Sequence, residues 1–384
     1  MWFLKRIVMK IKILFVFGTR PEAIKMAILI KEIQKQTNFI AKICVTRQHN
    51  EMLNQVLNLF GIVPDYDLDI MRENQSLEDI TSSILLKMRN VINDFKPNRI
   101  LVHGDTTTTF AATLSAYYHH TPVAHIEAGL RTGNIYSPFP EEINRKLTSS
   151  IADIHFAPTV NSKKNLLSEG ISEDNIYVTG NTVIDALVYI SSTVRKSQFL
   201  QSNFSYLLDK KKLILVTGHR RENFGNNFEN ICLALKEISK RNDVQIVYPV
   251  HLNPNIKKIV IQLLGNCNNI QLIQPLAYDE FVYLMNKSYL ILTDSGGVQE
   301  EAPTLSKPIL IIRDTTERPE VVETGAAKLI GTKKSNIVRE VSKLLDKQNN
   351  YHRMSKAKNP YGDGKASKKI VDILLKKYEN ILLN

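Results

Sequence analysis

Carboxylate side chains follow the ends of apolar segments in the first half of this 384-residue chain. Asp105 follows "RILVHG", Glu127 follows "PVAHI", and Glu141 and Glu142 follow "SPFP". Side chains at the carboxyl ends of parallel strands gather at one edge of a sheet, so we expect Asp105, Glu127 and one of the other two acids to converge. Grouped carboxylates can divide into an ionised and a protonated member, as paired acid/base catalysis requires. The pattern predicts proton-transfer chemistry.

Each of these acids also has a structural explanation. Asp105 precedes a threonine-rich helical segment and is a candidate for its N-cap. Glu141 or Glu142 would interact favourably with the dipole of the helix that follows. Glu127 lies at a strand tip, where no cap is needed, so its position is the hardest to explain without a function.

The second half of the chain carries groups suited to phosphate. The segment "LILTDSGGVQEEA" places Ser295, Gly296 and Gly297 at a predicted helix start, where backbone N–H groups and the helix dipole favour an anion. Glu300 and Glu301 would repel phosphate, but a carboxylate just beyond it can accept hydrogen bonds from ribose hydroxyls. This corner is predicted to hold a nucleotide diphosphate and its ribose.

Basic side chains follow two other predicted strands of this half. "VTGHRREN" supplies His219 and "RDTTERPE" supplies Arg318, both suited to a diphosphate. Arg313 is better explained by an ion pair with one of the acids that follow it, Asp314, Glu317 or Glu320. The sequence contains no GxxxxGK[ST], GxGxxG, HExxH, CxxC or GxSxG motif, so we predict neither a Walker loop nor a metal site.

The elements that position these residues follow from the hydrophobic pattern. Short apolar segments alternate with amphipathic ones from residue 11 to 180, and the alternation restarts near residue 211. This β-α-β rhythm predicts an α/β fold of two Rossmann-like doubly wound domains facing across a cleft, with ligands at the carboxyl ends of the strands. Expected strands are "IKILFVFG", "AKICVT", "RILVHGD", "PVAHIEAG", "DIHFAP", "NIYVTG", "KKLILVTGH", "VQIVYPVH", "IQLI", "YLILTDS" and "KPILIIRD". The expected divisions are a dispensable leader at 1–8, domains at 9–180 and 181–364, and a terminal helix at 365–384.

Composition excludes several classes. The net charge of +12 comes from lysines spread along the chain, which favours a charged surface over nucleic-acid binding. No apolar run is long enough to span a membrane. Cys44, Cys232 and Cys267 are few and widely spaced, which fits a reduced cytoplasm. The leader is expected to be dispensable because Lys5 and Arg6 interrupt it and the start-like Met9 follows.

Taken together, these motifs resemble one family, the bacterial non-hydrolysing UDP-N-acetylglucosamine 2-epimerases. The resemblance covers nearly the whole chain in order, through "FGTRPEAIKM", "VHGDTTTT", "HIEAGLRTG", "SPFPEEINR", "GNTVIDAL", "TGHRREN", "YPVHLNPN", "TDSGGVQEEAP", "RDTTERPE" and "NPYGDGKAS". It implies a glycosyltransferase-B type fold, a homodimer, no cofactor, and a terminal helix that packs back on the first domain.

The resemblance also implies residue roles. It assigns catalysis to Asp105, Glu127, Glu141 and His219. It assigns UDP-sugar binding to Arg20, Lys25, Phe281, Ser295, Gly296, Gly297, Glu301 and Arg318. Some members need a second substrate molecule as activator, for which Gln48, Glu51, Arg220, Glu222 and His251 are the candidates; ordinary loop polarity explains these five equally well.

The implied reaction interconverts UDP-N-acetylglucosamine and UDP-N-acetylmannosamine for cell-surface polysaccharide synthesis. Elimination of UDP would give 2-acetamidoglucal, and re-addition would deliver the C2 proton to the other face. A UDP-sugar glycosyltransferase, a hydrolysing epimerase and a non-catalytic nucleotide sensor are the alternatives. The last would not need Asp105, Glu127 and Glu141 together.

Overall fold

The computed structural model describes residues 10–47, 50–72, 74–218, 225–250 and 253–379. The predicted leader, 1–8, lies outside the described residues. Contacts divide the chain into two compact units, Met1–Ala186 with Tyr361–Asn384, and Leu187–Pro360. The first division falls inside helix α7 (Thr182–Val194), and the second lies shortly before helix α16 (Ala366–Lys377).

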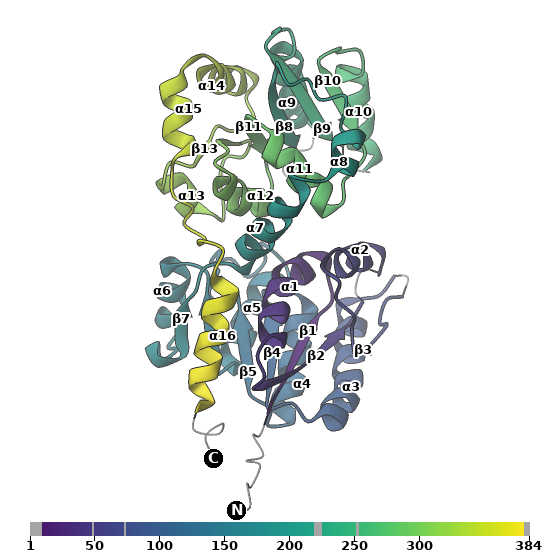
Figure 1. Ribbon diagram of the computed structural model, residues 1–384, viewed down its shortest axis with the longest axis vertical. Coiled ribbons are helices and arrows are strands. Elements are labelled where there is room, and N and C mark those ends of the chain that lie inside the picture. Colours follow the sequence, from purple (N-terminus) through teal and green to yellow (C-terminus); the bar gives the residue numbers. More distant parts are fainter. Residues whose placement is uncertain (1–9, 48–49, 73, 219–224, 251–252, 380–384) are drawn as a thin grey trace, which may run out of the picture. The chain divides into compact units, whose positions relative to one another are not determined.

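The first unit is built on a parallel sheet (Figure 1). Within the described residues its strand order is β3-β2-β1-β4-β5-β6-β7. The strands are β1 Ile11–Phe17, β2 Phe39–Val45, β3 Tyr66–Asp67, β4 Arg99–His103, β5 Val123–Ile126, β6 Ile154–Ala157 and β7 Ile176–Val178. The central strands β1, β4 and β5 consist almost entirely of buried residues, as expected for a sheet covered on both faces.

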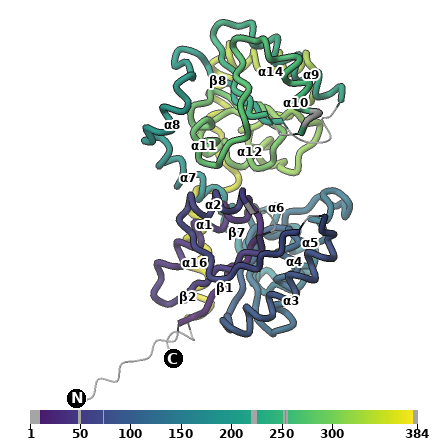
Figure 2. Tube along the Cα trace, turned by 90° about the vertical axis from the view of Figure 1, so that its right-hand side faces the viewer, coloured from purple at the N-terminus to yellow at the C-terminus, as the bar shows by residue number. Residues whose placement is uncertain are grey.

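Helices cover both faces of this sheet (Figure 2). Helices α1 (Arg20–Gln34), α2 (Asn50–Phe60) and α16 pack together, with α1 between the other two. Helices α3 (Leu77–Phe95), α4 (Thr107–Tyr118) and α5 (Glu141–Ile151) pack in sequence on the other face. Helix α6 (Val160–Ser168) and the 3-10 turn η1 (Glu173–Asn175) precede β7.

The chain returns to the first unit after residue 360, and α16 is fixed at both ends. Asp185 accepts hydrogen bonds from the backbone amides of Ala366, at 3.1 Å, and Ser367, at 2.7 Å. Arg99 Nε donates to Tyr378 Oη at 3.0 Å just beyond the helix. Gly180 has φ +91°, and a Cβ there would lie 3.1 Å from the carbonyl oxygen of Tyr361, so a side chain would obstruct the return.

The second unit repeats the architecture. Within the described residues its parallel sheet has the order β10-β9-β8-β11-β12-β13. The strands are β8 Lys212–Thr217, β9 Val244–Pro249, β10 Ile270–Ile273, β11 Leu290–Thr293, β12 Ile309–Ile311 and β13 Ala327–Leu329. The helices are α8 Gln198–Asn203, α9 Asn226–Ile238, α10 Pro254–Leu264, α11 Tyr278–Lys287, α12 Gly296–Glu301, α13 Pro319–Glu323, α14 Lys334–Asp346 and α15 Gln348–Ser355, with the 3-10 turn η3 at Ala302–Leu305.

The predicted strands are all present, and the two Rossmann-like domains are confirmed. The elements that the sequence did not predict include β3, β13 and α3. The two strands are too short to show a period, but α3 carried a signal, because Ser76 caps it and its buried residues recur at helical spacing. Residues 191–212 form the end of α7, helix α8 and the approach to β8.

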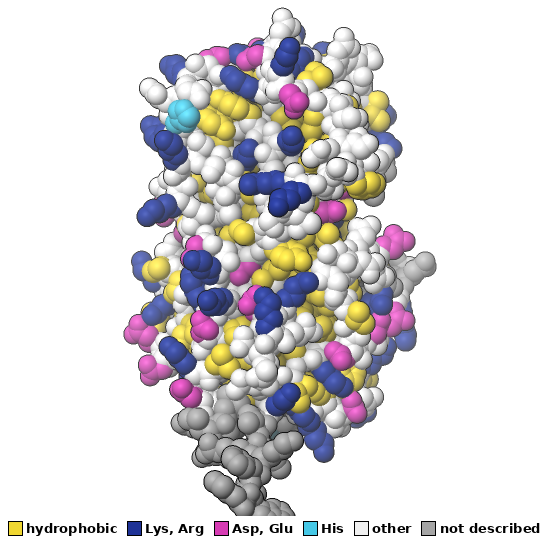
Figure 3. Space-filling view, viewed as in Figure 1, with side chains coloured by type: hydrophobic (Ala, Val, Ile, Leu, Met, Phe, Trp, Pro, Cys, Tyr) yellow, Lys and Arg dark blue, Asp and Glu magenta, His cyan; other side chains and the backbone are white. Residues whose placement is uncertain are grey.

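Basic side chains are spread over the face of the molecule that Figure 3 shows. On the face shown in Figure 3, lysine and arginine side chains are scattered among uncharged ones and do not form one continuous patch. No helix in the described part of the chain is both long and apolar enough to cross a membrane.

The cap on α16 leads to a stability prediction. Replacing Asp185 with alanine leaves two buried amides of α16 without their acceptor, which should cost about 1–3 kcal/mol. We expect faster hydrogen exchange and earlier proteolytic cleavage in 366–377. The control is Asp372→Ala, which removes an exposed carboxylate from α16 itself. Equal behaviour of the two variants would show that the Asp185 contacts do not hold this helix.

Candidate active site

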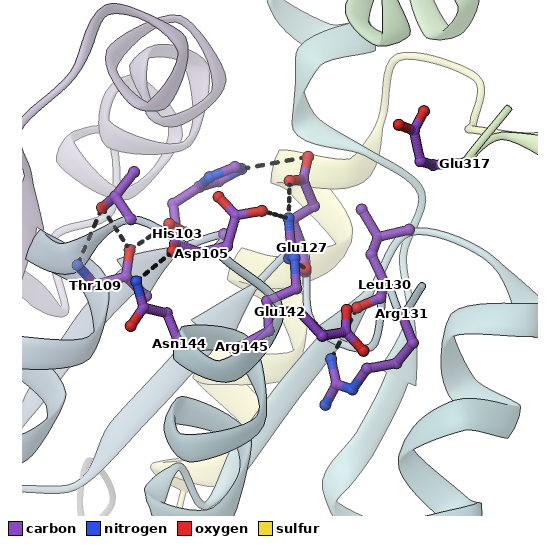
Figure 4. A network of polar contacts seen from close by, with 12 residues as sticks. His103, Asp105, Thr109, Glu127, Leu130, Arg131, Glu142, Asn144, Arg145 and Glu317 are labelled. Atoms are coloured by element: carbon purple, nitrogen blue, oxygen red, sulfur yellow. Dashed lines mark hydrogen bonds and ion pairs between the residues drawn. The ribbon is translucent and has the colours of Figure 1, made fainter. Parts of the chain in front are cut away.

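Polar side chains meet where β4 and β5 end (Figure 4). Glu127 directly follows β5, is 4% exposed and has φ +61°, a left-handed conformation uncommon for a residue with a side chain. This strained backbone conformation persists only because surrounding contacts compensate for its cost. In Figure 4, His103 and Arg145 converge on Glu127, and Asp105 on Arg145.

The Glu127 carboxylate has partners from three separate parts of the first unit. Lys25 of α1 forms an ion pair and hydrogen bond with Oε2. Arg145 of α5 donates to Oε1 at 2.9 Å and also to the Glu127 carbonyl oxygen. Asn181, just before α7, donates through Nδ2 to Oε2 at 2.8 Å. These contacts supply the compensation that a buried carboxylate requires.

This surrounding decides the protonation state of Glu127. Burial disfavours the charged form, but the charges of Lys25 and Arg145, with the hydrogen bond from Lys25, hold the pKa of Glu127 well below its usual range. Glu127 is therefore an ionised carboxylate held in a buried position.

Asp105 is joined to Glu127 through Arg145. Nη2 of Arg145 lies 2.6 Å from Oδ2 of Asp105 and 2.9 Å from Oε1 of Glu127. The Asp105 side chain is 30% exposed, so it can reach a ligand from this position. The N-cap of α4 is Thr106, whose side chain accepts from the Thr109 amide, so the capping alternative for Asp105 is wrong.

The structure separates the roles of Glu141 and Glu142. The carboxylate of Glu142 accepts hydrogen bonds from the amides of Thr132, at 3.0 Å, and Gly133, at 3.1 Å, so it fixes a loop. Glu141 is the first residue of α5, one turn before Arg145 and thus on the same helix face. Its Oε2 is buried and has no hydrogen-bond partner among the described residues. Of the two acids, Glu141 is therefore the one whose carboxylate can still form a hydrogen bond with a ligand.

Glu22, a buried carboxylate that was not predicted from the sequence, stabilises the turns next to this site. Glu22 accepts hydrogen bonds from the amides of Gly18 and Thr19, and its other oxygen accepts from Thr106 at 2.7 Å and Thr109 at 3.2 Å. It ties the turn after β1 to the turn after β4. Burial raises the pKa of Glu22 despite these hydrogen bonds. The signal was the sequence Thr-x-x-Glu at the start of α1, the pattern of a capping box.

Gly18 is required where these two turns approach each other. A Cβ there would lie 2.0 Å from Thr46 Oγ1 and 2.7 Å from Thr108 Oγ1, and those hydroxyls are themselves hydrogen-bonded at 2.8 Å. Any other residue at position 18 would carry this Cβ, whatever its side-chain rotamer, so every substitution would meet the same clash.

Three histidines of neighbouring strands, His103, His125 and His155, are buried, and His103 lies next to Glu127. Burial lowers the pKa of His103 to about 3 and that of His155 to about 4, and it lowers the pKa of His125 well below its usual range. Nε2 of His103 lies 3.8 Å from Oε2 of Glu127 and has no hydrogen-bond partner among the described residues. These side chains are neutral at physiological pH, so they add polarity without adding charge.

The predicted phosphate corner of the second unit lies at the end of β11. Ser295 is the N-cap of α12, and its amide donates to Thr293 Oγ1 at 2.9 Å. In this structure the Ser295 amide is therefore engaged by a protein hydroxyl, and its role toward phosphate stays a prediction. The amides of Gly296 and Gly297 open the helix, where no preceding carbonyl is in reach. A Cβ on Gly297 would meet nothing closer than Ser295 Oγ at 4.0 Å, so this position is open.

The acids behind this corner are already engaged. Glu300 is 1% exposed and forms an ion pair with Arg318. Glu301 accepts a hydrogen bond from Tyr278 Oη at 2.5 Å. The ion pair predicted for Arg313 is confirmed, with Glu317 as partner at 2.7 Å.

Comparison with known proteins decides the family. A profile of the UDP-N-acetylglucosamine 2-epimerase family matches residues 31–375. The chain is 58% identical over 377 residues to a UDP-N-acetylglucosamine 2-epimerase of Campylobacter jejuni, covering 96% of this chain and 98% of that protein. This chain belongs to the UDP-N-acetylglucosamine 2-epimerase family.

Solved epimerase structures agree with the fold. The UDP-GlcNAc 2-epimerase of Neisseria meningitidis bound to UDP-GlcNAc has a TM-score of 0.89 at 53% identity, covering 95% of this chain and 100% of that one. The Methanocaldococcus jannaschii enzyme in complex with UDP-GlcNAc and UDP has a TM-score of 0.80 at 37% identity, with the same coverage. The glycosyltransferase-B type fold expected from the sequence is thereby confirmed.

The other residues assigned by the epimerase resemblance lie in both units. Arg20 opens α1, Phe281 is half-buried on α11, and Glu51 is exposed on α2. Five assigned residues lie outside the described residues: Gln48, His219, Arg220, Glu222 and His251. Arg145 and Asn181, which bind Glu127, were not predicted as site residues, because neither adjoins Glu127 in the sequence.

The shared guanidinium of Arg145 predicts a large stability effect. Arg145→Met would leave Glu127 buried without a main partner, and breaking a buried pair in this way costs about 3–5 kcal/mol. The control is Arg241→Met, since Arg241 pairs with Asp243 and Asp346 at the surface and should change stability by at most about 1 kcal/mol. Urea unfolding followed by circular dichroism compares them. Similar losses would mean that Arg145 does not stabilise a buried charge.

Proposed function

We propose that this protein epimerises UDP-N-acetylglucosamine at C2, without hydrolysis, by eliminating and re-adding UDP. In the first half-reaction the C1–O bond to UDP breaks, the C2 proton passes to a protein base, and a C1–C2 double bond forms. In the second, UDP adds to C1 of the 2-acetamidoglucal and a protein acid returns a proton to the other face of C2. No net redox change occurs, so no cofactor is needed.

One observation carries this proposal: Arg145 holds Glu127 and Asp105 together, with Glu141 one turn before it on α5, in a chain that matches UDP-GlcNAc 2-epimerases over almost its entire length. Protonation on either face of C2 requires at least two groups able to exchange protons. Asp105 is partly exposed and Glu141 has a buried oxygen without a partner among the described residues, so these two are proposed to carry protons together with Glu127.

Lys25 connects substrate binding to the state of Glu127. In the free protein Lys25 pairs with Glu127, whereas the family resemblance places Lys25 near the diphosphate. We propose that the diphosphate attracts Lys25 away from Glu127. Removing this neighbouring charge raises the pKa of Glu127, so the carboxylate becomes a stronger base only when substrate is present.

The nucleotide is proposed to bind the second unit, at Gly296, Gly297 and Arg318 with Glu301 at the ribose. Support comes from the open position at Gly297 and from the relatives whose structures hold UDP-GlcNAc or UDP. A bound diphosphate would compete with Glu300 for Arg318. The homodimer, the cytoplasmic location and the second, activating substrate molecule remain proposals from the family resemblance.

Turnover in deuterium oxide tests the mechanism. We expect proton NMR to show UDP-N-acetylmannosamine with deuterium at C2, and prolonged incubation to release a little UDP and 2-acetamidoglucal. Asp105→Asn, Glu127→Gln and Glu141→Gln should each slow epimerisation by about 100-fold to 10,000-fold. The control is Glu169→Gln, since Glu169 pairs with Arg131 away from the cluster and should leave turnover unchanged.

The same experiment separates the alternatives. Product that retains its original C2 hydrogen would exclude elimination. Release of free N-acetylmannosamine with stoichiometric UDP would indicate a hydrolysing epimerase. Transfer of the sugar to an added acceptor without exchange at C2 would indicate a glycosyltransferase.

The Lys25 proposal predicts a pH effect. Because Lys25 favours the ionised form of Glu127, Lys25→Met should raise the pKa of Glu127 in the free enzyme. The acid limb of the kcat/KM profile, which reports groups of the free enzyme, should therefore move to higher pH. Lys35→Met, which removes an exposed lysine just after α1, serves as the control. If the acid limb of the kcat/KM profile stays at the same pH in the Lys25→Met variant, the proposed role of Lys25 is contradicted.

A further inference from the structure

A cavity of about 260 Å³ opens on the second unit, apart from the proposed nucleotide corner. It lies among the segment that follows α7, helix α8, helix α11 and η3. Its lining residues are Arg195, Gln201, Tyr283, Asn286, Lys287, Leu305 and Lys307. None of them is among the residues assigned to UDP or to catalysis. Phe281, which is assigned to UDP, is two positions before Tyr283 on α11, so the two side chains leave the helix in different directions.

The charged residues that line this cavity all carry the same sign. Arg195, Lys287 and Lys307 come from three different segments, and no carboxylate lines the cavity with them. Arg195 and Lys287 are exposed and Lys307 is half-buried, and none of the three forms an ion pair with another described residue. Three cations around one cavity repel each other, and an anion between them would remove that cost.

Hydrogen bonds hold this basic pocket in shape. Oδ1 of Asn286 accepts from Arg195 Nε at 3.0 Å and from Ser191 Oγ at 3.1 Å, while Nδ2 of Asn286 donates to the Val282 carbonyl at 2.9 Å. Lys307 Nζ donates to the Ser288 carbonyl at 2.7 Å, which leaves two of its three N–H donors for a ligand. A preformed set of donors needs little reorganisation on binding.

The protonation of Lys307 shows the influence of its surroundings. Burial, with a smaller contribution from the charge of Arg195, lowers the pKa of Lys307 to about 8. The lysine is therefore still charged near neutral pH, but it is the cation in this group that would gain most from a negative partner.

We propose that this basic pocket binds a small anion of the phosphate class, either inorganic phosphate or a phosphomonoester. The three cations provide charge-assisted donors, and Gln201 and Asn286 add neutral polar groups at the rim. The volume lies below the range usual for drug-sized ligands, about 300–1,000 Å³, so a whole nucleotide sugar would not fit. Arg195 directly follows α7, so an anion here would fasten that segment to α11 and η3 of the second unit.

The test uses the full chain saturated with UDP, so that the proposed nucleotide site is occupied before anion is added. Sulfate, which keeps its double charge across the pH range, is compared with sodium chloride at equal ionic strength. We expect sulfate to raise the melting temperature above the chloride control, because a ligand that binds the folded state stabilises it. Calorimetric titration with inorganic phosphate should show saturable binding.

Variants locate the binding. The double variant Arg195→Gln, Lys307→Gln loses two charge-assisted contacts and should bind phosphate at least about tenfold more weakly. Lys236→Gln removes an exposed lysine of α9 and should bind as the unmodified protein does. Tighter binding of glycerol 3-phosphate than of phosphate would identify a phosphate ester as the ligand class, and the reverse order would identify the free ion.

Equal affinity of the double variant and the Lys236 variant would overturn the proposal, as would an equal response to sulfate and chloride in the unmodified protein. These outcomes are independent of catalysis. A protein without epimerase activity would refute the proposed function and leave the comparison of variants unaffected.

Discussion

The buried negative charge of Glu127 is the constraint on which the first unit depends. An ionised carboxylate with 4% exposure is tolerable only if cations and hydrogen-bond donors surround it. Those donors come from α1, α5 and the segment before α7, so neutralising one charge fixes three elements around the end of β5. The left-handed backbone of Glu127 aims the carboxylate into this ring of donors. A site built in this way is rigid before any ligand arrives, as electrostatic catalysis requires.

Glu22 is a second buried carboxylate that joins several elements of the first unit. Glu22 is held by amides and hydroxyls from the turns after β1 and β4. The two acids consequently differ in protonation: burial raises the pKa of Glu22, whereas nearby cations lower that of Glu127. Hydrogen bonds alone position the turns, and charge is concentrated where chemistry is proposed.

The second unit distributes charge in the opposite way. Its acids Glu300 and Glu301 are engaged by Arg318 and Tyr278, while the basic pocket has cations without acids. At the proposed nucleotide corner, a phosphate would have to compete with Glu300 for Arg318. In the basic pocket, an anion would have no protein acid to displace. The difference suggests two anion sites of different size on one Rossmann-like domain.

The sequence alone determined most of the strands, the two domains, the family and the strand-end positions of Asp105 and Glu127, because these depend on local periodicity and on motifs that are contiguous in the chain. Only the tertiary structure decided that Thr106 caps α4, that Glu142 holds a loop, and that the Ser295 amide is already taken. It also revealed that Arg145 and Asn181 bind Glu127. It brought together the cations of the basic pocket, of which Arg195 and Lys307 lie far apart in the sequence. Contacts between distant residues, and the pKa values that follow from them, depend on how the elements pack, and no local pattern encodes that.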